Sequence, residues 1–461
     1  MRHRTRAFAL SAAAAVMLAG CSGGTPNEGA AEEVTKLTFW TGQTTPERVT
    51  AQEEIAARFT AKTGIEVEVV PLSGPDQNTT LLANVASGEV PDVILHGWEQ
   101  SASWVDQGIL DQKAAAEVIA GLGEETFAEG AMRMIEVGGQ PSGVPMDGWG
   151  YLYLYRSDLF EAAGLDAPKT IEDLAAAAEK LSADGKGGIA LGNQPGNAWL
   201  GETLEASVLP NGCQLVAGGK VTIDSPACVH ALEVYQRMAA TNGGAQFDVE
   251  AGRSAYLSGQ ASMLMFSSHI LDEVAGLDEA NPPTCPECKE DPGFLAQNTG
   301  VLTSLTGADG TEPVQFGTVL QLSIPTGAQT EAAKDYVEFL MTDGYVDSLA
   351  MATVGRVPVR LGTAENPTEY IDAWSKLPLG ADGQGGSIAK VYGDEVAQQV
   401  ATGSENYVRW GAGTDDVLLA SLVTQQQVVP QNIGDLFSAG DPAKVAEGLA
   451  AAAEAVQQET E

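Results

Sequence analysis

Residues 143–155 read Gly143-Val144-Pro145-Met146-Asp147-Gly148-Trp149-Gly150-Tyr151-Leu152-Tyr153-Leu154-Tyr155. Glycine and proline punctuate the first half, which predicts a loop, whereas tyrosine and leucine alternate in the second half with the two-residue period of a β-strand. A compact pattern of strands and helices precedes this stretch, and a longer, less regular region follows it. We therefore interpret it as a crossing between two lobes. Asp147 and Trp149, at the loop, are predicted to contact whatever lies between the lobes.

The region before the crossing has a βαβαβ pattern. Its predicted strands are residues 37–40, 65–70 and 92–95, and its predicted helices span about residues 45–62 and 77–87. Leu81, Leu82 and Val85 are expected to form the buried face of the second helix. This order predicts a parallel, doubly wound sheet with right-handed crossovers, and therefore an α/β fold.

In such a sheet, ligands bind beyond the carboxyl ends of the strands. This rule selects the residues at the ends of the three predicted strands, namely Trp40, Thr41, Gln43, Gln77, Asn78, His96 and Trp98. Tryptophan rings stack on the C–H faces of sugars and amides pair with sugar hydroxyls, so the set is typical of a carbohydrate site. The alternative for Trp40 and Trp98 is packing in the core.

The region after the crossing continues with helices and strands. Helices are predicted near residues 170–181, 225–240, 250–257 and 330–341, and strands at 189–191, 263–266 and 317–324. Asn193 and Trp199 follow the first of these strands in a polar loop, and His269 follows the second. These three residues are further candidate ligand contacts.

The composition excludes some partners. The chain has 461 residues, with 62 acidic against 24 basic side chains, and a formal net charge of −38. This field repels nucleic acid and anionic lipid headgroups, so neither is an expected partner. It does not restrict a neutral ligand.

The N-terminus has the pattern of a secretion signal. Arginines at positions 2, 4 and 6 precede an apolar run over residues 7–18, which ends in Leu18-Ala19-Gly20-Cys21. This ending resembles the lipobox of bacterial lipoproteins, in which the cysteine is acylated and becomes the mature N-terminus. Residues 1–20 are then a signal peptide, Cys21 carries the lipid, and residues 21–35 form a linker on the outer face of the cell membrane. The alternatives are an ordinary signal peptide or a membrane helix, for which the run is short.

Four further cysteines suit the oxidising compartment that this signal implies. Cys213, Cys228, Cys285 and Cys288 allow three disulfide pairings, of which Cys213–Cys228 with Cys285–Cys288 is the most local. The alternatives are a redox CxxC or a zinc site. The CxxC lacks the strand–helix setting of a thioredoxin and the spacing is unlike a zinc ribbon, so structural disulfides are preferred.

The ordered set of motifs resembles the extracellular solute-binding proteins of ABC importers, in the sugar-binding family that includes maltose-binding protein. The residues that carry the resemblance are Phe39-Trp40, 55–59 with Thr63-Gly64-Ile65-Glu66-Val67, 87–93, Gly143-Val144-Pro145, 153–165 with Ala167-Pro168-Lys169-Thr170, and Gly355-Arg356-Val357-Pro358. They span nearly all of the mature chain. The sequence departs from the family at Tyr155-Arg156 and at Ser267-Ser268-His269.

The resemblance implies two α/β lobes, each a mostly parallel sheet flanked by helices, with a cleft that closes on the ligand. The first lobe is expected to comprise residues 36–145 and about 300–345, and the second about 146–299 and 346–461. Ligand contacts carried over from the family are Trp40, Gln43, Asn78, Trp98, Asp147, Trp149 and Arg356.

The expected function is capture of a mono- or oligosaccharide outside the cytoplasm and its delivery to an ABC permease, by a monomer without cofactor, metal or catalytic residues. HExxH, GxSxG and Walker A motifs are absent from the sequence. One alternative is a binding protein for a non-sugar solute, such as a peptide or metal chelate. Another is a secreted glycan hydrolase that uses two of the many carboxylates.

Overall fold

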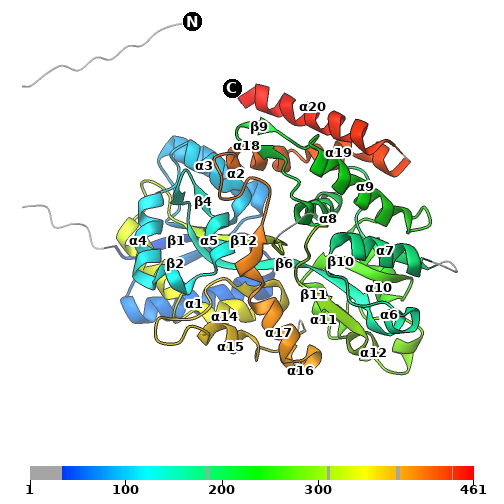
Figure 1. The fold of residues 1–461 in the computed structure, drawn as a ribbon. Coiled ribbons are helices and arrows are strands. Elements are labelled where there is room, and N and C mark those ends of the chain that lie inside the picture. The colour runs from blue at the N-terminus through cyan, green and yellow to red at the C-terminus, as the bar shows by residue number, and fades with distance from the viewer. Residues whose placement is uncertain (1–33, 183–185, 309–311, 381–384, 439, 461) are drawn as a thin grey trace, which may run out of the picture. The chain divides into compact units, whose positions relative to one another are not determined.

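One long strand, β6 (Val144–Arg156), runs through the centre of the computed structural model, which describes residues 34–182, 186–308, 312–380, 385–438 and 440–460 (Figure 1). The predicted crossing is therefore strand along its whole length, including the half expected to be a loop. The glycines in that half are required by packing. A Cβ at Gly148 would collide with the carbonyl of Thr318, and one at Gly150 would collide with the side chain of Gln315.

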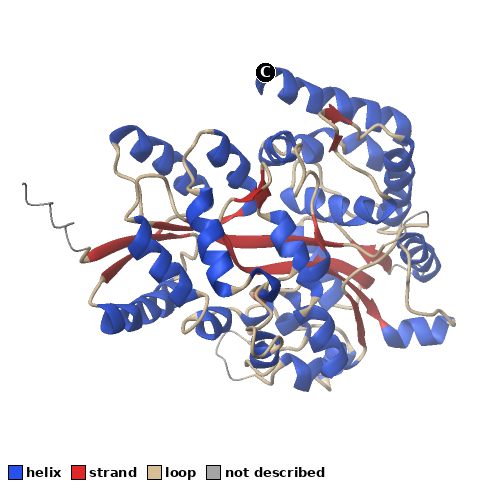
Figure 2. Ribbon diagram, turned by 60° about the vertical axis from the view of Figure 1, so that its left-hand side comes forward, coloured by secondary structure: helices blue, strands red, loops and turns tan. Residues whose placement is uncertain are grey.

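The neighbours of β6 place it in a mixed sheet. The main path of hydrogen-bonded strands is β2 (Glu66–Pro71), β1 (Lys36–Thr41), β3 (Val93–Gly97), β12 (Gln315–Ser323), β6, β10 (Ala261–Ser267) and β7 (Gly187–Ala190). Strands β1, β2 and β3 are parallel, as the βαβαβ pattern predicts, whereas β12 is antiparallel to both β3 and β6. Helices cover both faces of the sheet, so the predicted α/β class is confirmed (Figure 2).

β6 changes partners along its length. Its first part, up to Gly150, pairs with β12, and its second part, from Tyr151, pairs with β10. Two short strands pair with β6 as well, namely β11 (Thr299–Leu302) with residues 153–156 and β13 (Val357–Pro358) with residues 147–148. We call the two regions that it joins the β1 side and the β10 side.

The β1 side carries α1 (Pro46–Thr63), α2 (Gly74–Ser87), α3 (Ser101–Asp106), α4 (Gln112–Leu122), α5 (Glu129–Met134), α13 (Thr330–Leu340), α14 (Tyr345–Ala350) and α15 (Glu369–Trp374). The β10 side carries α6 (Ser157–Ala163), α7 (Ile171–Leu181), α8 (Ala198–Val208), α9 (Pro226–Ala240), α10 (Val249–Leu257), α11 (Ile270–Val274) and α12 (Phe294–Gln297). The remaining helices follow in the last part of the chain, as α16 (Ile388–Tyr392), α17 (Asp394–Ala401), α18 (Val417–Gln425), α19 (Val428–Asn432) and α20 (Pro442–Thr460). None of the helices in the described residues combines the length and hydrophobicity of a membrane span.

Local signals explain several helix boundaries. α1 starts at Pro46, whose missing N–H costs nothing in a first turn, and ends at Gly64 with φ of 82°. Thr170 and Asp173 form a complete capping box at the start of α7. α2 departs from prediction, because Leu81 is fully buried whereas Leu82 and Val85 are 39% and 40% exposed.

The segment after residue 345 departs from the expected lobe boundary. Asp347 on α14 forms an ion pair of 2.6 Å with Arg58 on α1. The buried guanidinium of Arg360 donates to the carbonyls of Met341, at 2.6 Å, and Leu122, at 3.0 Å. Residues 345–374 therefore pack on the β1 side, although the sequence placed them in the second lobe.

The structure contains the local pair of disulfides. Cys213 is bonded to Cys228 across the small hairpin of β8 (Val216–Ala217) and β9 (Lys220–Val221), and Cys285 is bonded to Cys288. Both CxxC sulfurs belong to buried residues, at 0% and 5% exposure. The CxxC is therefore a buried structural disulfide in the loop-rich segment before α12.

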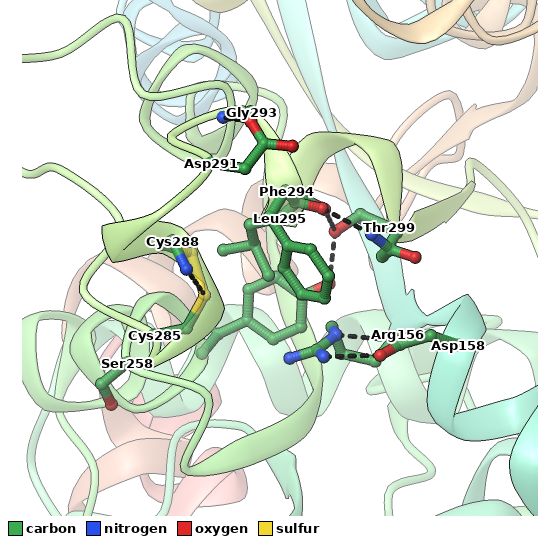
Figure 3. Close-up of a disulfide and its surroundings, with 12 residues drawn as sticks. Arg156, Asp158, Ser258, Cys285, Cys288, Asp291, Gly293, Phe294, Leu295 and Thr299 are labelled. Carbon is green, nitrogen blue, oxygen red and sulfur yellow. Dashed lines mark hydrogen bonds and ion pairs between the residues drawn. A yellow bond between two sulfur atoms is a disulfide. The ribbon is translucent and has the colours of Figure 1, made fainter.

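The second disulfide lies beside a buried arginine at the end of β6. Arg156 donates two hydrogen bonds to the Asp158 carboxylate, at 2.8 and 2.7 Å, and its guanidinium lies 5.1 Å from the Phe294 ring (Figure 3). Burial tends to lower the pKa of Arg156, but Asp158 outweighs it and holds the pKa above its ordinary value. Arg156, one of the departures from the family pattern, is thus used for packing.

Candidate ligand-binding cleft

A cavity of about 320 Å³ opens at the carboxyl ends of β1 and β3, against β6. Six of the predicted contact residues line it, namely Gln43, Gln77, His96, Trp149, His269 and Arg356. Gln43 follows β1, His96 lies on β3, and Trp149 lies on β6, so three separate strands position these side chains. The rule that ligands bind beyond strand carboxyl ends therefore locates the cavity.

A second cavity, of about 210 Å³, adjoins the first. Gly97, Glu99, Trp149 and Leu320 line both cavities, so the two adjoin, and we call them together the cleft. The second cavity is bounded mainly by the β10 side and the C-terminal helices, and its charged and aromatic lining includes Glu202, Glu205, Arg409 and Trp410. Trp149 is only partly buried and stands at the junction of the two halves.

An ion pair anchors the wall of the first cavity. Arg356 donates from Nε and Nη2 to the same oxygen of Asp147, at 3.1 and 2.6 Å, and both side chains are buried. Burial raises the pKa of Asp147, although the charges of Arg356 and Arg48 oppose the shift. Asp147 does not itself line the cavity; it positions Arg356, which does.

Two neutral imidazoles complete this half of the cleft. The ring of His96 is hydrogen-bonded to the Gly97 carbonyl, at 2.7 Å, and to the Ser323 hydroxyl, at 2.8 Å. His269 stands edge-on to Trp149 with 5.5 Å between ring centroids. Burial lowers the pKa of both histidines to about 4, so both are uncharged at neutral pH.

Carboxylates dominate the second cavity. Arg409 pairs with Glu205 at 3.0 Å and lies at a longer 3.9 Å from Glu99. Glu202 accepts a hydrogen bond from the Tyr151 hydroxyl. Burial raises the pKa of Glu99, partly offset by Arg409. Within the described residues, no group of three His, Cys, Asp or Glu side chains could hold a metal ion.

The structure does not bring the other predicted residues to the cleft. Trp40 packs in a core cluster with Leu81, Ile94 and Trp104, and Asn78 accepts a hydrogen bond from the Trp104 indole at 2.9 Å. Trp98 is buried beneath the Arg409 guanidinium, which lies 4.8 Å from its ring. The two tryptophans of the predicted sugar platform are therefore core residues, because short buried strands place their ends within the packed interior.

Three further predicted residues serve local structure. Thr41 is fully buried, and its hydroxyl accepts from the backbone N–H of Gln43 at 3.1 Å. The amide of Asn193 bonds to the backbone of Ala245 and Phe247, at 2.8 and 2.5 Å, which fixes a loop away from the cleft. Trp199 is buried against Phe266.

Sequence reasoning missed several lining residues, among them Arg48, Glu99, Gln100, Glu202, Glu205, Arg409 and Trp410. Glu99 and Gln100 directly follow the selected Trp98 and could have been included with it. Arg48 lies on the first turn of α1, near the selected strand end. Arg409 and Trp410 come from the last part of the chain, where no sequence signal points to the cleft.

The comparisons with known proteins match this architecture. The family model for bacterial extracellular solute-binding proteins matches residues 41–347. The chain belongs to this family. The solute-binding protein is also 28% identical over 394 residues to YcjN of Escherichia coli K12, named as an ABC transporter periplasmic-binding protein, covering 82% of this chain and 84% of that one.

Solved structures share the two-lobed fold of the solute-binding protein. The cyclic α-maltosyl-1,6-maltose binding protein of Arthrobacter globiformis has a TM-score of 0.69 at 17% identity, covering 92% of this chain and 99% of that one. The sugar-binding protein MalE of Xanthomonas citri has a TM-score of 0.69 at 18% identity, covering 92% and 98%. These similarities establish the two-lobed fold. The protein is thus the solute-binding component of an ABC transporter.

Proposed function

We propose that this protein captures a carbohydrate in the cleft and delivers it to the permease of an ABC importer. The observation that carries the proposal is the position of Trp149, whose partly exposed ring lines both cavities. An indole face at the middle of a cleft is suited to stacking on a sugar ring. The side chains of Gln43, Gln77 and Arg356 surround it with hydrogen-bonding groups for hydroxyls.

Capture would proceed by closure of the two lobes on the solute. Closure excludes water, which strengthens the hydrogen bonds from the cleft to the solute. The rings of His96 and His269 are neutral, so these two side chains add no charge to the wall beside Trp149. The closed form would then dock on the permease as a monomer.

The pairing of the cleft carboxylates favours binding over hydrolysis. A glycosidase needs one carboxylic acid and one carboxylate on either side of the scissile bond. Of the carboxylates that line the cleft, Glu205 is paired with Arg409 at 3.0 Å, Glu202 accepts from the Tyr151 hydroxyl, and Glu99 lies 3.9 Å from Arg409, so all three are engaged by other side chains. Incubation of the purified protein with oligosaccharides should leave them intact, and release of shorter sugars would contradict the proposal.

A thermal-shift screen tests the function directly. A ligand that binds only the native state adds about 2.7 kcal/mol to the free energy of unfolding at a hundredfold excess over Kd, and therefore raises Tm. We expect at least one class of mono- or oligosaccharide to raise Tm, and amino acids and short peptides to leave it unchanged. A response to peptides alone would overturn the carbohydrate assignment while leaving the transport role.

The N-terminal segment is proposed to attach the protein to the outer face of the cell membrane. Residues 1–20 and Cys21 lie outside the described residues, so this proposal rests on the Leu-Ala-Gly-Cys sequence. The expected mature form begins at Cys21 and carries a diacylglycerol thioether. Mass spectrometry of the membrane fraction should show this mass, and Cys21→Ala should release the protein from that fraction.

A further inference from the structure

Arg48 is a cleft guanidinium without an acidic partner. Its side chain, from the first turn of α1, lines the first cavity, and its Nη1 donates to the Gln43 side-chain oxygen at 2.9 Å. None of the ion pairs in the described part of the chain includes Arg48. In a protein of net charge −38, an arginine left unpaired in a cavity is unusual, because acidic partners are plentiful.

The other charges of the first cavity are already matched. Arg356 is paired with Asp147 behind the cavity wall, and both histidines are neutral. Glu99 lies at the boundary with the second cavity, where its nearest cation is Arg409 at 3.9 Å. Burial lowers the pKa of Arg48, the positive charge of Arg356 lowers it further, and the negative charge of Asp147 partly opposes both. A negative group beside Arg48 would be stabilised chiefly by that one guanidinium, because Asp147 already matches the charge of Arg356.

The second cavity has the opposite character. Glu99, Glu202 and Glu205 face it together with a single arginine, Arg409. The first cavity thus holds one arginine without an ion pair, and the second holds excess carboxylate. On its other side Arg48 lines a further cavity that includes Glu47, Asp272, Glu273 and Asp278. A solute with negative charge at both ends would be repelled by the second cavity.

We infer that the solute is an acidic sugar with one carboxylate group, which binds Arg48 while the sugar ring packs on Trp149. This inference rests on the proposed carbohydrate function. Guanidinium binds carboxylate through two parallel hydrogen bonds, and the N–H groups of Arg48 beyond Gln43 are suited to this role. One unpaired cation matches one carboxylate. A sugar phosphate, with nearly two negative charges at neutral pH, would exceed it.

Isothermal titration of the purified protein with matched sugars tests the inference. The probes are glucuronate, galacturonate, their neutral parents glucose and galactose, glucosamine, glucose 6-phosphate, and disaccharides of a uronic acid with a neutral sugar. We expect a uronate or a uronate-containing disaccharide to bind at least tenfold more tightly than its neutral parent. Stronger binding of neutral sugars, glucosamine or the phosphate would overturn the inference and leave the proposed function intact. Failure of every sugar, acidic and neutral, would overturn both.

Substitution of Arg48 tests the residue itself. Arg48→Gln should weaken the acidic sugar at least tenfold and leave its neutral parent within about twofold, whereas Arg48→Lys should retain most of the preference. Arg58→Gln is the matched control, since Arg58 lies on the same helix but pairs with Asp347 at the surface. An equal loss for acidic and neutral sugars in Arg48→Gln would show a structural role and overturn the inference. Circular dichroism and unchanged Tm in the absence of ligand verify that each variant is folded.

Discussion

Arg356 donates both hydrogen bonds of its Asp147 contact to one carboxylate oxygen, and the other oxygen of Asp147 is buried without a partner. The pair joins β6 to the turn before β13, so it ties the crossing strand to a segment more than two hundred residues downstream. Both members of the pair are needed for stability, because removal of either one leaves the other as a buried charge without a partner.

Removal of one member of this pair should strongly destabilise the protein. Arg356→Met leaves the buried Asp147 carboxylate uncompensated, and we expect a loss of about 3–5 kcal/mol in the free energy of unfolding. Asp147→Asn combined with Arg356→Met should recover part of that loss. Chemical denaturation measures both, with Arg58→Met as the control, because its exposed pair with Asp347 should be worth less than about 1 kcal/mol. A double variant that is less stable than Arg356→Met alone would contradict this account.

Trp149→Ala should weaken ligand binding at least tenfold without unfolding the protein. The indole lines both cavities, and its removal eliminates the stacking surface while leaving the strand pairing of β6 intact. Trp149→Phe, which keeps an aromatic face, should retain most of the affinity. Calorimetry with the solute found in the screen measures both variants. Unchanged affinity in Trp149→Ala would remove this residue from the site.

The two disulfides should differ in their contribution to stability. Cys213 and Cys228 are 15 residues apart, whereas Cys285 and Cys288 are 3 apart. In the chain-entropy model the longer loop contributes about 3 kcal/mol and the shorter one about 2 kcal/mol. Unfolding of the Cys213→Ser/Cys228→Ser and Cys285→Ser/Cys288→Ser variants would measure the difference. A larger loss for the shorter loop would show that packing around Arg156, rather than loop entropy, sets its value.

Stability should fall as pH rises from about 4 to 7, in part through Asp272. Burial raises the pKa of this carboxyl from 3.8 to about 6, and the charge of Asp278 adds to the shift. Because the folded state holds the proton more tightly than the unfolded chain, this contribution is complete below about pH 3.8 and is lost as pH rises through about 6. As pH rises from 4 to 7, the free energy of unfolding of Asp272→Asn should increase by about 1–3 kcal/mol relative to that of the parent. The exposed Asp166→Asn serves as control; a parallel pH profile for Asp272→Asn and the parent would refute the prediction.

Adjacent leucines on α2 should respond very differently to truncation. Leu81 is fully buried in the cluster that contains Trp40, whereas Leu82 is 39% exposed. Leu81→Ala should cost about 2–5 kcal/mol through lost contacts and a cavity, and Leu82→Ala should change stability by less than about 0.5 kcal/mol. Equal losses in urea unfolding would indicate that Leu82 packs against other atoms in solution.

The sequence predicts the parts of this fold that depend on local signals. The period-two pattern and turn residues locate β1 to β3, and Ser225-Pro226 marks the start of α9, as the structure has it. The short apolar run that ends at Trp40 was equally compatible with a rim tryptophan or a core tryptophan. Trp40 lies in the core because α2 and α3 pack over the end of β1. This packing is tertiary, so the hydrophobic period of the sequence does not predict it.

The cleft was predictable only where it follows strand ends. Gln43, His96 and Trp149 come from the rule for parallel sheets or from the crossing. Arg409 and Trp410 directly follow β14 (Tyr407–Val408), a two-residue strand beside β12 that is too short to give a sequence pattern. The glycines of the crossing show a similar limit. They suggest flexibility in the sequence, but Gly148 and Gly150 are present because Thr318 and Gln315 of β12 leave no room for a side chain.

The place of β12 in the sheet has a consequence for the order of folding. This strand lies between β3 and β6, so that Leu322 is opposite both Leu95 and Val144, and Ser323 bonds to His96 from 227 positions away. The first three strands therefore have an unpaired inner edge until the chain has been made past residue 323. Such distant pairing is slow, because the intervening loop must first be closed at an entropic cost. A nascent chain of this kind stays incompletely folded while most of it is synthesised, which is the condition that export through a narrow translocation channel requires.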